Sequence, residues 1–133
     1  MIKNSKVIDD SDILKLYEAN GWTNYTDNLP TLIKGINNSL DCFTYYEEDI
    51  LVGLVRVVGD GVTIIYIQDI LVLPEYHSKG VGSLLIGEVT KKYKNVRQIV
   101  LMTDSEESQH KFYEKNGFGK ISTWGGVAFN FKA

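Results

Sequence analysis

The sequence predicts a mixed α/β domain built around one sheet, and three observations support this prediction. β-rich apolar runs occupy 40–47, 50–58 and 62–73, and short turns join them. A stretch with helical spacing follows at 81–93, and another apolar run follows at 96–103. Hairpins followed by a β-α-β crossover give a mostly antiparallel sheet flanked by helices.

Composition limits the class of protein. The chain has 133 residues and a net charge of −3 without a basic stripe, so we expect one domain, 1–133, and no nucleic-acid partner. Cys42 is the only cysteine, which fits a reducing compartment and a place in the core. The N-terminus lacks the apolar core of a signal peptide, and no run is long enough for a membrane span. We therefore expect a cytoplasmic protein without a membrane partner or a metal.

The first third of the chain is typical of two helices. Asp10 or Ser11 caps the first helix, and Asn20-Gly21 ends it. The range 22–27 is expected to be a loop, and Pro30 begins a second short helix at about 31–38. A short first strand at 3–8 remains open.

The middle strands form a meander. Glu48-Asp49 and Gly59-Asp60-Gly61 are expected as its tight turns. The strand over 62–73 is unusually long, and strands of this length can carry a β-bulge. The following helix is expected to bury one face, made of Val81, Leu84, Leu85, Val89 and Tyr93.

The last elements follow the same reasoning. The run over 96–103 is apolar enough for a central strand, and 104–115 is helical up to a stop at Asn116-Gly117. The ranges 121–124 and 127–131 read as a final hairpin around Gly125-Gly126.

The loop between the long strand and its helix is the most informative stretch of the chain. The first turn of a helix has unpaired backbone N–H groups and a positive dipole end, and Gly80 and Gly82 let an anion approach the backbone. A Rossmann fingerprint is excluded because Leu85 stands where its third glycine belongs, and no P-loop pattern is present. Taken alone, the glycines could simply shape a tight turn.

Two motifs together resemble those of the GNAT superfamily of N-acetyltransferases. The stretch over 69–82, DILVLPEYHSKGVG, resembles motif A, [QR]-x-x-G-x-[GA] after a strand, with His77 at the Gln/Arg position. The stretch over 112–118, FYEKNGF, resembles motif B. The two motifs lie in the expected order, and the order of elements matches the family over nearly the whole chain.

The resemblance implies that acetyl-CoA is the cofactor. Its pyrophosphate would lie on the backbone of the loop and first helical turn, with contacts from His77, Ser78, Lys79, Gly80, Val81, Gly82 and Ser83. Its pantetheine amides would pair with the preceding strand, at Ile70, Leu71 and Val72. A bulge would separate that strand from its neighbour, and an N–H of Val72 or Leu71 would stabilise the oxyanion.

The resemblance also implies a general acid, Tyr113, which would protonate the leaving CoA thiolate. A phenol with a pKa of about 10 can hydrogen-bond or protonate a thiolate whose thiol has a pKa of about 8.5. The alternative is an ordinary packed tyrosine. Glu106 and Gln109 depart from the family's usual Asn and Ala, which leaves the cofactor contacts of this helix open.

The general base is not evident. A primary amine is only about a thousandth neutral at pH 7, so some group must accept its proton. Several family members use a glutamate on the long strand, but this chain has Tyr66 and Gln68 there. Asp69 is the candidate if a bulge turns it toward the site, and a structural carboxylate or a chain of waters are the alternatives.

The acceptor region is expected before the sheet and along the long strand, with contacts from Trp22, Tyr25 and Gln68. Aromatic rings there could stack over a cationic acceptor, although Trp22 could instead fasten the loop to the core. Trp124 and Phe129 would close the other side.

The sequence therefore predicts an acetyl-CoA-dependent N-acetyltransferase. It would acetylate a primary amine of a small molecule or peptide by direct attack in a ternary complex. The alternatives are a non-catalytic acyl-CoA-binding sensor and a protein that binds a nucleotide through the same loop. The C-terminal strands could pair across a homodimer.

Overall fold

The computed structural model describes residues 1–132, which separate after Leu101 into two compact units. The single domain expected over the whole chain stays a prediction. The first unit contains β1 (Ile2–Asn4), α1 (Asp10–Ala19), α2 (Thr23–Thr26), α3 (Leu29–Asn37), β2 (Asp41–Glu47), β3 (Ile50–Gly59), β4 (Ile64–Val72), the 3-10 turn η1 (Pro74–Tyr76), α4 (Val81–Lys92) and β5 (Gln98–Val100).

The first unit is built on a five-stranded sheet in the order β1-β2-β3-β4-β5. The first three pairings are antiparallel, and β4 pairs with β5 in parallel through the crossover helix α4. The expected mixed α/β class with a β-α-β crossover is confirmed. The expectation of a central strand at 96–103 was wrong, because β5 spans only Gln98–Val100 and has one neighbour among the described strands.

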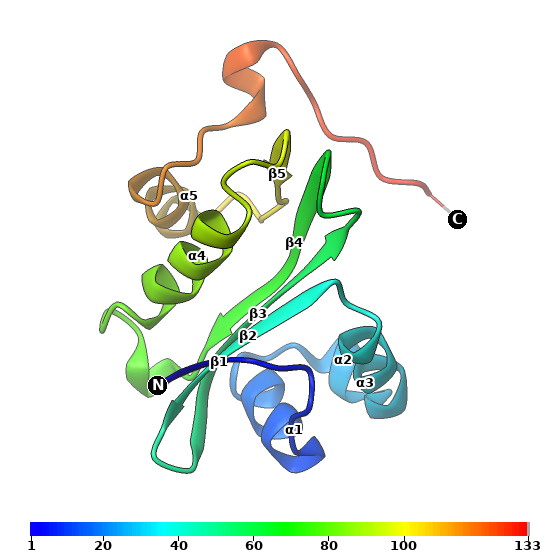
Figure 1. Cartoon of the computed structure of the whole chain (residues 1–133), viewed down its shortest axis with the longest axis vertical. Helices are drawn as coiled ribbons and strands as arrows, with labels where there is room; N and C mark the ends of the chain where they lie inside the picture. The colour runs from blue at the N-terminus through cyan, green and yellow to red at the C-terminus, as the bar shows by residue number, and fades with distance from the viewer. Residues whose placement is uncertain (133) are drawn as a thin grey trace. The chain divides into compact units, whose positions relative to one another are not determined.

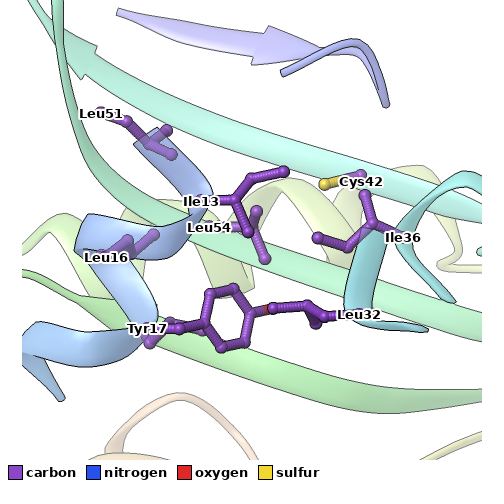
Figure 2. Close-up of a cluster of buried hydrophobic side chains, with 9 residues drawn as sticks. Ile13, Leu16, Tyr17, Leu32, Ile36, Cys42, Leu51 and Leu54 are labelled. Carbon is purple, nitrogen blue, oxygen red and sulfur yellow. The ribbon is translucent and has the colours of Figure 1, made fainter. Parts of the chain in front are cut away.

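Helices cover both faces of this sheet, as Figure 1 shows. Figure 2 shows one face, where side chains of α1 and α3 pack against β2 and β3 around Tyr17, Cys42 and Leu54. On the other face α4 lies close to β3 at Gly53, where an added Cβ would come within 3.1 Å of Val81 and Leu85. The glycine therefore lets the first turn of α4 approach the sheet.

The other end of α4 is held by polar contacts. The buried carboxylate of Asp41, at the start of β2, forms an ion pair with Lys92 and accepts a 2.6 Å hydrogen bond from the Tyr93 hydroxyl. The helix is thus fixed to the sheet at both ends, which holds its N-terminus beside the end of β4.

The long strand carries the bulge that its length suggested. The β3–β4 register shifts between Arg56, which pairs with Asp69, and Val57, which pairs with Ile67. Gln68 is therefore the extra residue of β4. Because Arg56 and Val57 lie on opposite faces of β3, the bulge turns Asp69 onto the face covered by α1.

The second unit contains α5 (Glu107–Lys115) and the 3-10 turn η2 (Ile121–Trp124). The expected final hairpin was wrong. The first half of it forms η2, whose Trp124 ring packs back over Gly119, and Gly125 ends the turn with φ of +84°. The second half has no assigned helix or strand up to residue 132.

Three local expectations also differ from the structure. Asp9, rather than Asp10 or Ser11, caps α1, because its carboxylate accepts a hydrogen bond from the Ser11 N–H. The expected loop 22–27 contains the one-turn helix α2. Leu84 of α4 is exposed.

Candidate active site

The loop between β4 and α4 has the backbone of an anion-binding site. Ser78 has φ of +66° and Gly80 has φ of +83°, so both take left-handed conformations between residues of ordinary φ. Successive changes of this kind turn neighbouring backbone N–H groups toward one side. Apart from Glu48, Ser78 is the only non-glycine with positive φ among residues 1–132, and such strain tends to occur at functional sites.

The N-terminus of α4 fits a pyrophosphate. It has no side-chain cap and no acidic residue in its first turn, so its N–H groups and its positive dipole end face an exposed loop. An added Cβ at Gly80 would meet nothing within 4 Å, which leaves room for a bulky anion. Lys79 lies 5.6 Å from the ring centre of Tyr76 on the same exposed loop.

His77 links this loop to the strand before it. Its Nε2 lies 2.9 Å from the carbonyl oxygen of Val72, so the tautomer that carries the proton on Nε2 donates to that carbonyl. The side chain at the family's Gln/Arg position therefore fastens the loop to the last residue of β4.

On its side away from β3, the end of β4 has no partner strand among the described residues, and we call this side its free edge, although the Val72 carbonyl there contacts His77. Leu73 N–H donates to the carbonyl of Val52, so Leu71 also faces β3, while Val72 and Ile70 turn their N–H and C=O groups to the other side. On that side β5 pairs only with Ile64 to Tyr66, before the bulge. Of the two candidates for the oxyanion donor, this geometry favours Val72 over Leu71.

Asp69 is 2% exposed and lies in a network of donors. Its Oδ2 accepts from Arg56 Nε at 2.6 Å and from the Tyr17 hydroxyl at 2.9 Å, and its Oδ1 accepts from the Tyr25 hydroxyl at 3.1 Å. Burial and the carboxylate both raise the pKa of Tyr17, which keeps it a donor. Burial lowers the pKa of Arg56, but the carboxylate of Asp69 outweighs this effect and raises that pKa above its ordinary value.

The contacts of Asp69 argue against its expected role as the general base. Arg56, Tyr17 and Tyr25 already donate hydrogen bonds to its two oxygens, and the side chain is buried. The geometry favours a positioning role for Asp69.

Trp22, Tyr25 and Gln68, the expected acceptor residues, lie close to this network. Gln68 Nε2 donates to the Tyr25 hydroxyl at 3.2 Å. The rings of Trp22 and Tyr25 lie 6.0 Å apart, and both pack on the hydrophobic core. Trp22 thus fastens the loop to the core, which was one of its two expected roles.

Tyr113 belongs to the second unit. It lies on α5, where its ring makes edge contacts with Phe112 and Phe118, at 5.1 and 6.1 Å between ring centres. Its role as general acid stays a prediction. Trp124 and Phe129, expected to close the site, are exposed side chains of the same unit.

Arg56 and Tyr17 were missed as parts of the site. For Arg56 the sequence did contain a signal, because it is a charged residue in the middle of an apolar strand. A charged side chain that is buried there needs a partner. Only the strand register shows that this partner is Asp69.

Comparison with known proteins places this geometry in a family. The model of the acetyltransferase (GNAT) domain matches residues 38–120. A GNAT-family acetyltransferase, SP0256 of Streptococcus pneumoniae, is 34% identical, with a TM-score of 0.90 over 100% of this chain and 97% of that chain. The chain therefore belongs to the GNAT acetyltransferase family, as its two motifs predicted.

Two further relatives add detail. The uncharacterized N-acetyltransferase ycf52 of Gracilaria tenuistipitata is 26% identical over 80% of this chain. The chain spans 60% of the length of that protein and 46% of a second curated relative, from Gibberella zeae. The structure of the aminoglycoside N-acetyltransferase AAC(6')-Iy in complex with CoA shares the fold, with 20% identity and a TM-score of 0.75 over 99% of this chain and 93% of that chain.

Among the described residues, no helix combines the length and apolar character needed to cross a bilayer.

Proposed function

We propose that this chain is an acetyl-CoA-dependent N-acetyltransferase that acetylates a primary amine of a small molecule or a peptide. One observation carries the proposal. A strand edge freed by a bulge, with Val72 at its end, leads directly into a left-handed loop at the N-terminus of α4. Strand edge and helix terminus together suit a ligand that has amides at one end and a pyrophosphate at the other.

The proposed chemistry combines the edge of β4 with the acid that the family resemblance implies. Acetyl-CoA supplies a thioester whose carbonyl carbon bonds to the amine nitrogen while the carbon–sulfur bond breaks and the CoA thiol leaves. The N–H of Val72 faces the free edge and is the proposed donor to the carbonyl oxygen, where negative charge develops. Tyr113 is the proposed source of the proton for the sulfur, and the proton of the amine leaves through ordered water.

The occupied Asp69 also supports a second candidate. Tyr66 and Gln68 are not competent bases, and the oxygens of Asp69 already accept three hydrogen bonds. A protein with the cofactor surface but without a base would be an acyl-CoA-binding sensor.

Release of thiol from acetyl-CoA across a panel of amines separates these functions. We expect amine-dependent release at a rate well above hydrolysis for at least one class of acceptor. Binding of acetyl-CoA, seen as a thermal shift, without release for any amine would support the sensor. Binding of ATP or NAD that CoA does not displace would support the nucleotide-binding alternative.

Tyr113→Phe tests the general acid. General acid catalysis contributes typically 10²- to 10⁴-fold, so we expect turnover to fall by about 100-fold or more with little change in CoA affinity. Phe112→Tyr, which keeps the ring contact, is the matched control. Unchanged turnover of Tyr113→Phe would remove Tyr113 from the mechanism.

The acceptor, the assembly and the location are parts of the same proposal. The aminoglycoside acetyltransferase of the same fold supports small-molecule amines as acceptors, and peptide amino termini remain in the panel. A homodimer is proposed on the exposed apolar residues of the C-terminal segment. A cytoplasmic location is supported by the single buried cysteine, which suits a reducing compartment.

A further inference from the structure

The bulge in β4 lies between two points that fix the pairing of this strand with β3. The first point is the turn before β4, where the carboxylate of Asp60 accepts hydrogen bonds from the backbone N–H groups of 62–64. An added Cβ at Gly59 would come within 2.4 Å of the Ile64 carbonyl oxygen, so the two strands approach closely there. This turn holds Gly59 opposite Ile65.

The second point is the ion pair of Arg56 and Asp69, which lie opposite each other with side chains that are 8% and 2% exposed. Between the turn and the ion pair there are three steps along β3, from Gly59 to Arg56. Along β4 there are four steps, from Ile65 to Asp69. The two fixed points thus differ by one residue, and Gln68 is the residue left outside the ladder.

Apolar side chains do not distinguish this pairing from a ladder without a bulge. If the register of the first half of β4 continued, each residue after Gln68 would take the partner that its successor has now. Ile70 would then replace Leu71, and Leu71 would replace Val72. Exchanges among apolar residues of similar volume are tolerated in protein cores, and backbone hydrogen bonds form in either ladder.

The carboxylate of Asp69 does distinguish the two ladders. In the observed register it lies on the face covered by α1, where Arg56, Tyr17 and Tyr25 donate to it. Without the bulge it would lie opposite Val55, which is fully buried on the face covered by α4. Two buried charges would then have lost each other as partners, which is strongly destabilising. Buried polar groups can specify register through such a cost.

We propose that the buried Arg56–Asp69 pair maintains the bulge in β4 and thereby keeps the strand edge open for acetyl-CoA. The pairing of β4 with β5 stops at Tyr66, before the bulge, and beyond the bulge Val72 turns its N–H to the free edge. Both charged residues are positioning residues, which act on the cofactor through the backbone of β4. The inference rests on the proposed function and adds the element that holds the cofactor edge open.

A variant in which the carboxylate moves by one residue tests this role. In Gln68→Asp/Asp69→Leu, a carboxylate comes to lie opposite Arg56 only in the ladder without a bulge, and the apolar side chain at position 69 then suits the face covered by α4. The variant can therefore keep a buried ion pair. We expect it to lose the bulge and to bind acetyl-CoA at least about 10-fold more weakly by isothermal titration, the equivalent of one or two hydrogen bonds.

Proton NMR measures the register directly. The N–H of Leu73 donates to the carbonyl of Val52. The preceding pair, Val72 and Gly53, therefore has no mutual hydrogen bonds, and its α-hydrogens face each other. The wild type should show an Hα–Hα contact between Val72 and Gly53, and the variant should show one between Leu71 and Gly53 instead.

Two control variants separate the bulge from general stability. Gln68→Asp alone leaves Asp69 opposite Arg56, so it should keep the Hα contact of the wild type and its affinity for acetyl-CoA. Ser39→Ala removes the 3.3 Å hydrogen bond from Arg56 Nη1 but leaves the ion pair, so it should lower the Tm without changing that affinity. The wild-type Hα contact in Gln68→Asp/Asp69→Leu, or an equal loss of affinity in Ser39→Ala, would overturn the proposal.

Arg56→Met/Asp69→Leu keeps the test decisive if the first variant does not fold. Replacement of a buried ion pair by apolar residues of similar volume is often tolerated, and it leaves no charge to choose between the ladders. This variant should show the Hα contacts of both registers, and the wild-type contact alone would contradict the role of the ion pair.

Activity and register are measured independently. If the wild type releases no thiol with any amine, the acetyltransferase function fails, but the NMR contacts and the binding of acetyl-CoA still test the ion pair. If the wild type turns over and the moved carboxylate changes neither the contact nor the affinity, only the role of the ion pair fails.

Discussion

At the scale of single residues, His77 joins two parts of the proposed cofactor surface. Its ring fastens the loop to the carbonyl of Val72, on the free edge of β4. We expect His77→Ala to loosen the loop and weaken acetyl-CoA binding about 2- to 10-fold, the value of one hydrogen bond, without changing turnover at saturation. Isothermal titration of acetyl-CoA measures this effect.

His77→Gln is the control for this prediction, because an amide can also donate to the carbonyl and glutamine is the residue that the family prefers there. It should keep the affinity of the wild type. Equal affinity of His77→Ala would mean that the contact does not hold the loop.

The sequence shows residue roles best where a motif fixes the backbone. Gly80 was recognised because a phosphate site at a helix start needs a residue that lets the anion approach the backbone, and the structure adds that its φ is +83°. The positive φ of Ser78 had no such signal. Asp69 was singled out, but its partners Arg56 and Tyr17 come from distant parts of the chain, and no local pattern pairs them.

At the scale of elements, the bulge at Gln68 divides β4 into two parts. The part before it pairs with β5, and the part after it has the edge proposed to bind the cofactor. Deletion of Gln68 would leave Ile67 and Asp69 adjacent and on opposite faces, as their partners Val57 and Arg56 require. We therefore expect the deletion variant to fold cooperatively but to pair β4 more fully with β5. Its affinity for acetyl-CoA should fall by at least about 10-fold, the equivalent of one or two hydrogen bonds.

Gln68→Ala is the matched control, because it keeps the extra residue and should keep the affinity. A deletion variant that unfolds cooperatively and binds acetyl-CoA like the wild type would contradict the role of the bulge.

The turn before β4 gives a prediction for pH. Asp60 accepts hydrogen bonds from the Thr63 hydroxyl and from the N–H groups of Val62, Thr63 and Ile64. These bonds, first of all the one from Thr63, lower the pKa of Asp60 in the folded state. A lowered carboxyl pKa adds stability above the unfolded pKa of about 3.9 and loses it as the pH falls through the folded pKa.

Thermal unfolding of Asp60→Asn against pH measures this effect. The variant should melt below the wild type at pH 7, and the difference in Tm should shrink steadily as the pH falls below about 4. Thr90→Ala, on the surface of α4, controls for the loss of a polar group elsewhere. A difference in Tm that is independent of pH would mean that the charge of Asp60 does not matter.

The elements themselves show where sequence patterns succeed. The meander and the crossover helix α4 were predicted because apolar period and turn residues agree there. The expected final hairpin is absent from the described residues, because an alternating pattern does not ensure a partner strand. Its first half forms the turn η2, in which the Trp124 ring packs over Gly119. The existence of a bulge followed from strand length, but its position depends on the register.

At the scale of the whole molecule, the C-terminal segment is the main exposed apolar surface described. Val127, Phe129 and Phe131 occupy alternate positions in the sequence and are 72%, 91% and 89% exposed. Apolar segments of this kind are usually covered, and pairing with a second copy would cover them. We expect a dimer by light scattering, and a monomer after removal of 127–133.

Phe129→Lys is a milder form of the same experiment, since a charge disfavours edge pairing. Val7→Lys, at another exposed apolar position, is its control and should leave the assembly unchanged. A monomeric wild type would contradict the proposed homodimer.

The core cysteine has a practical consequence for every experiment above. Cys42 is fully buried beside the network of Asp69, and burial, above all, raises the pKa of its thiol to about 12. Because the thiolate is the reactive form, the folded protein should give no background in an assay that colours released thiol. When the protein unfolds, the Cys42 thiol becomes accessible and reacts with the colour reagent, so it reports unfolding. Its labelling rate therefore measures how often each variant opens, in the cuvette that records its activity.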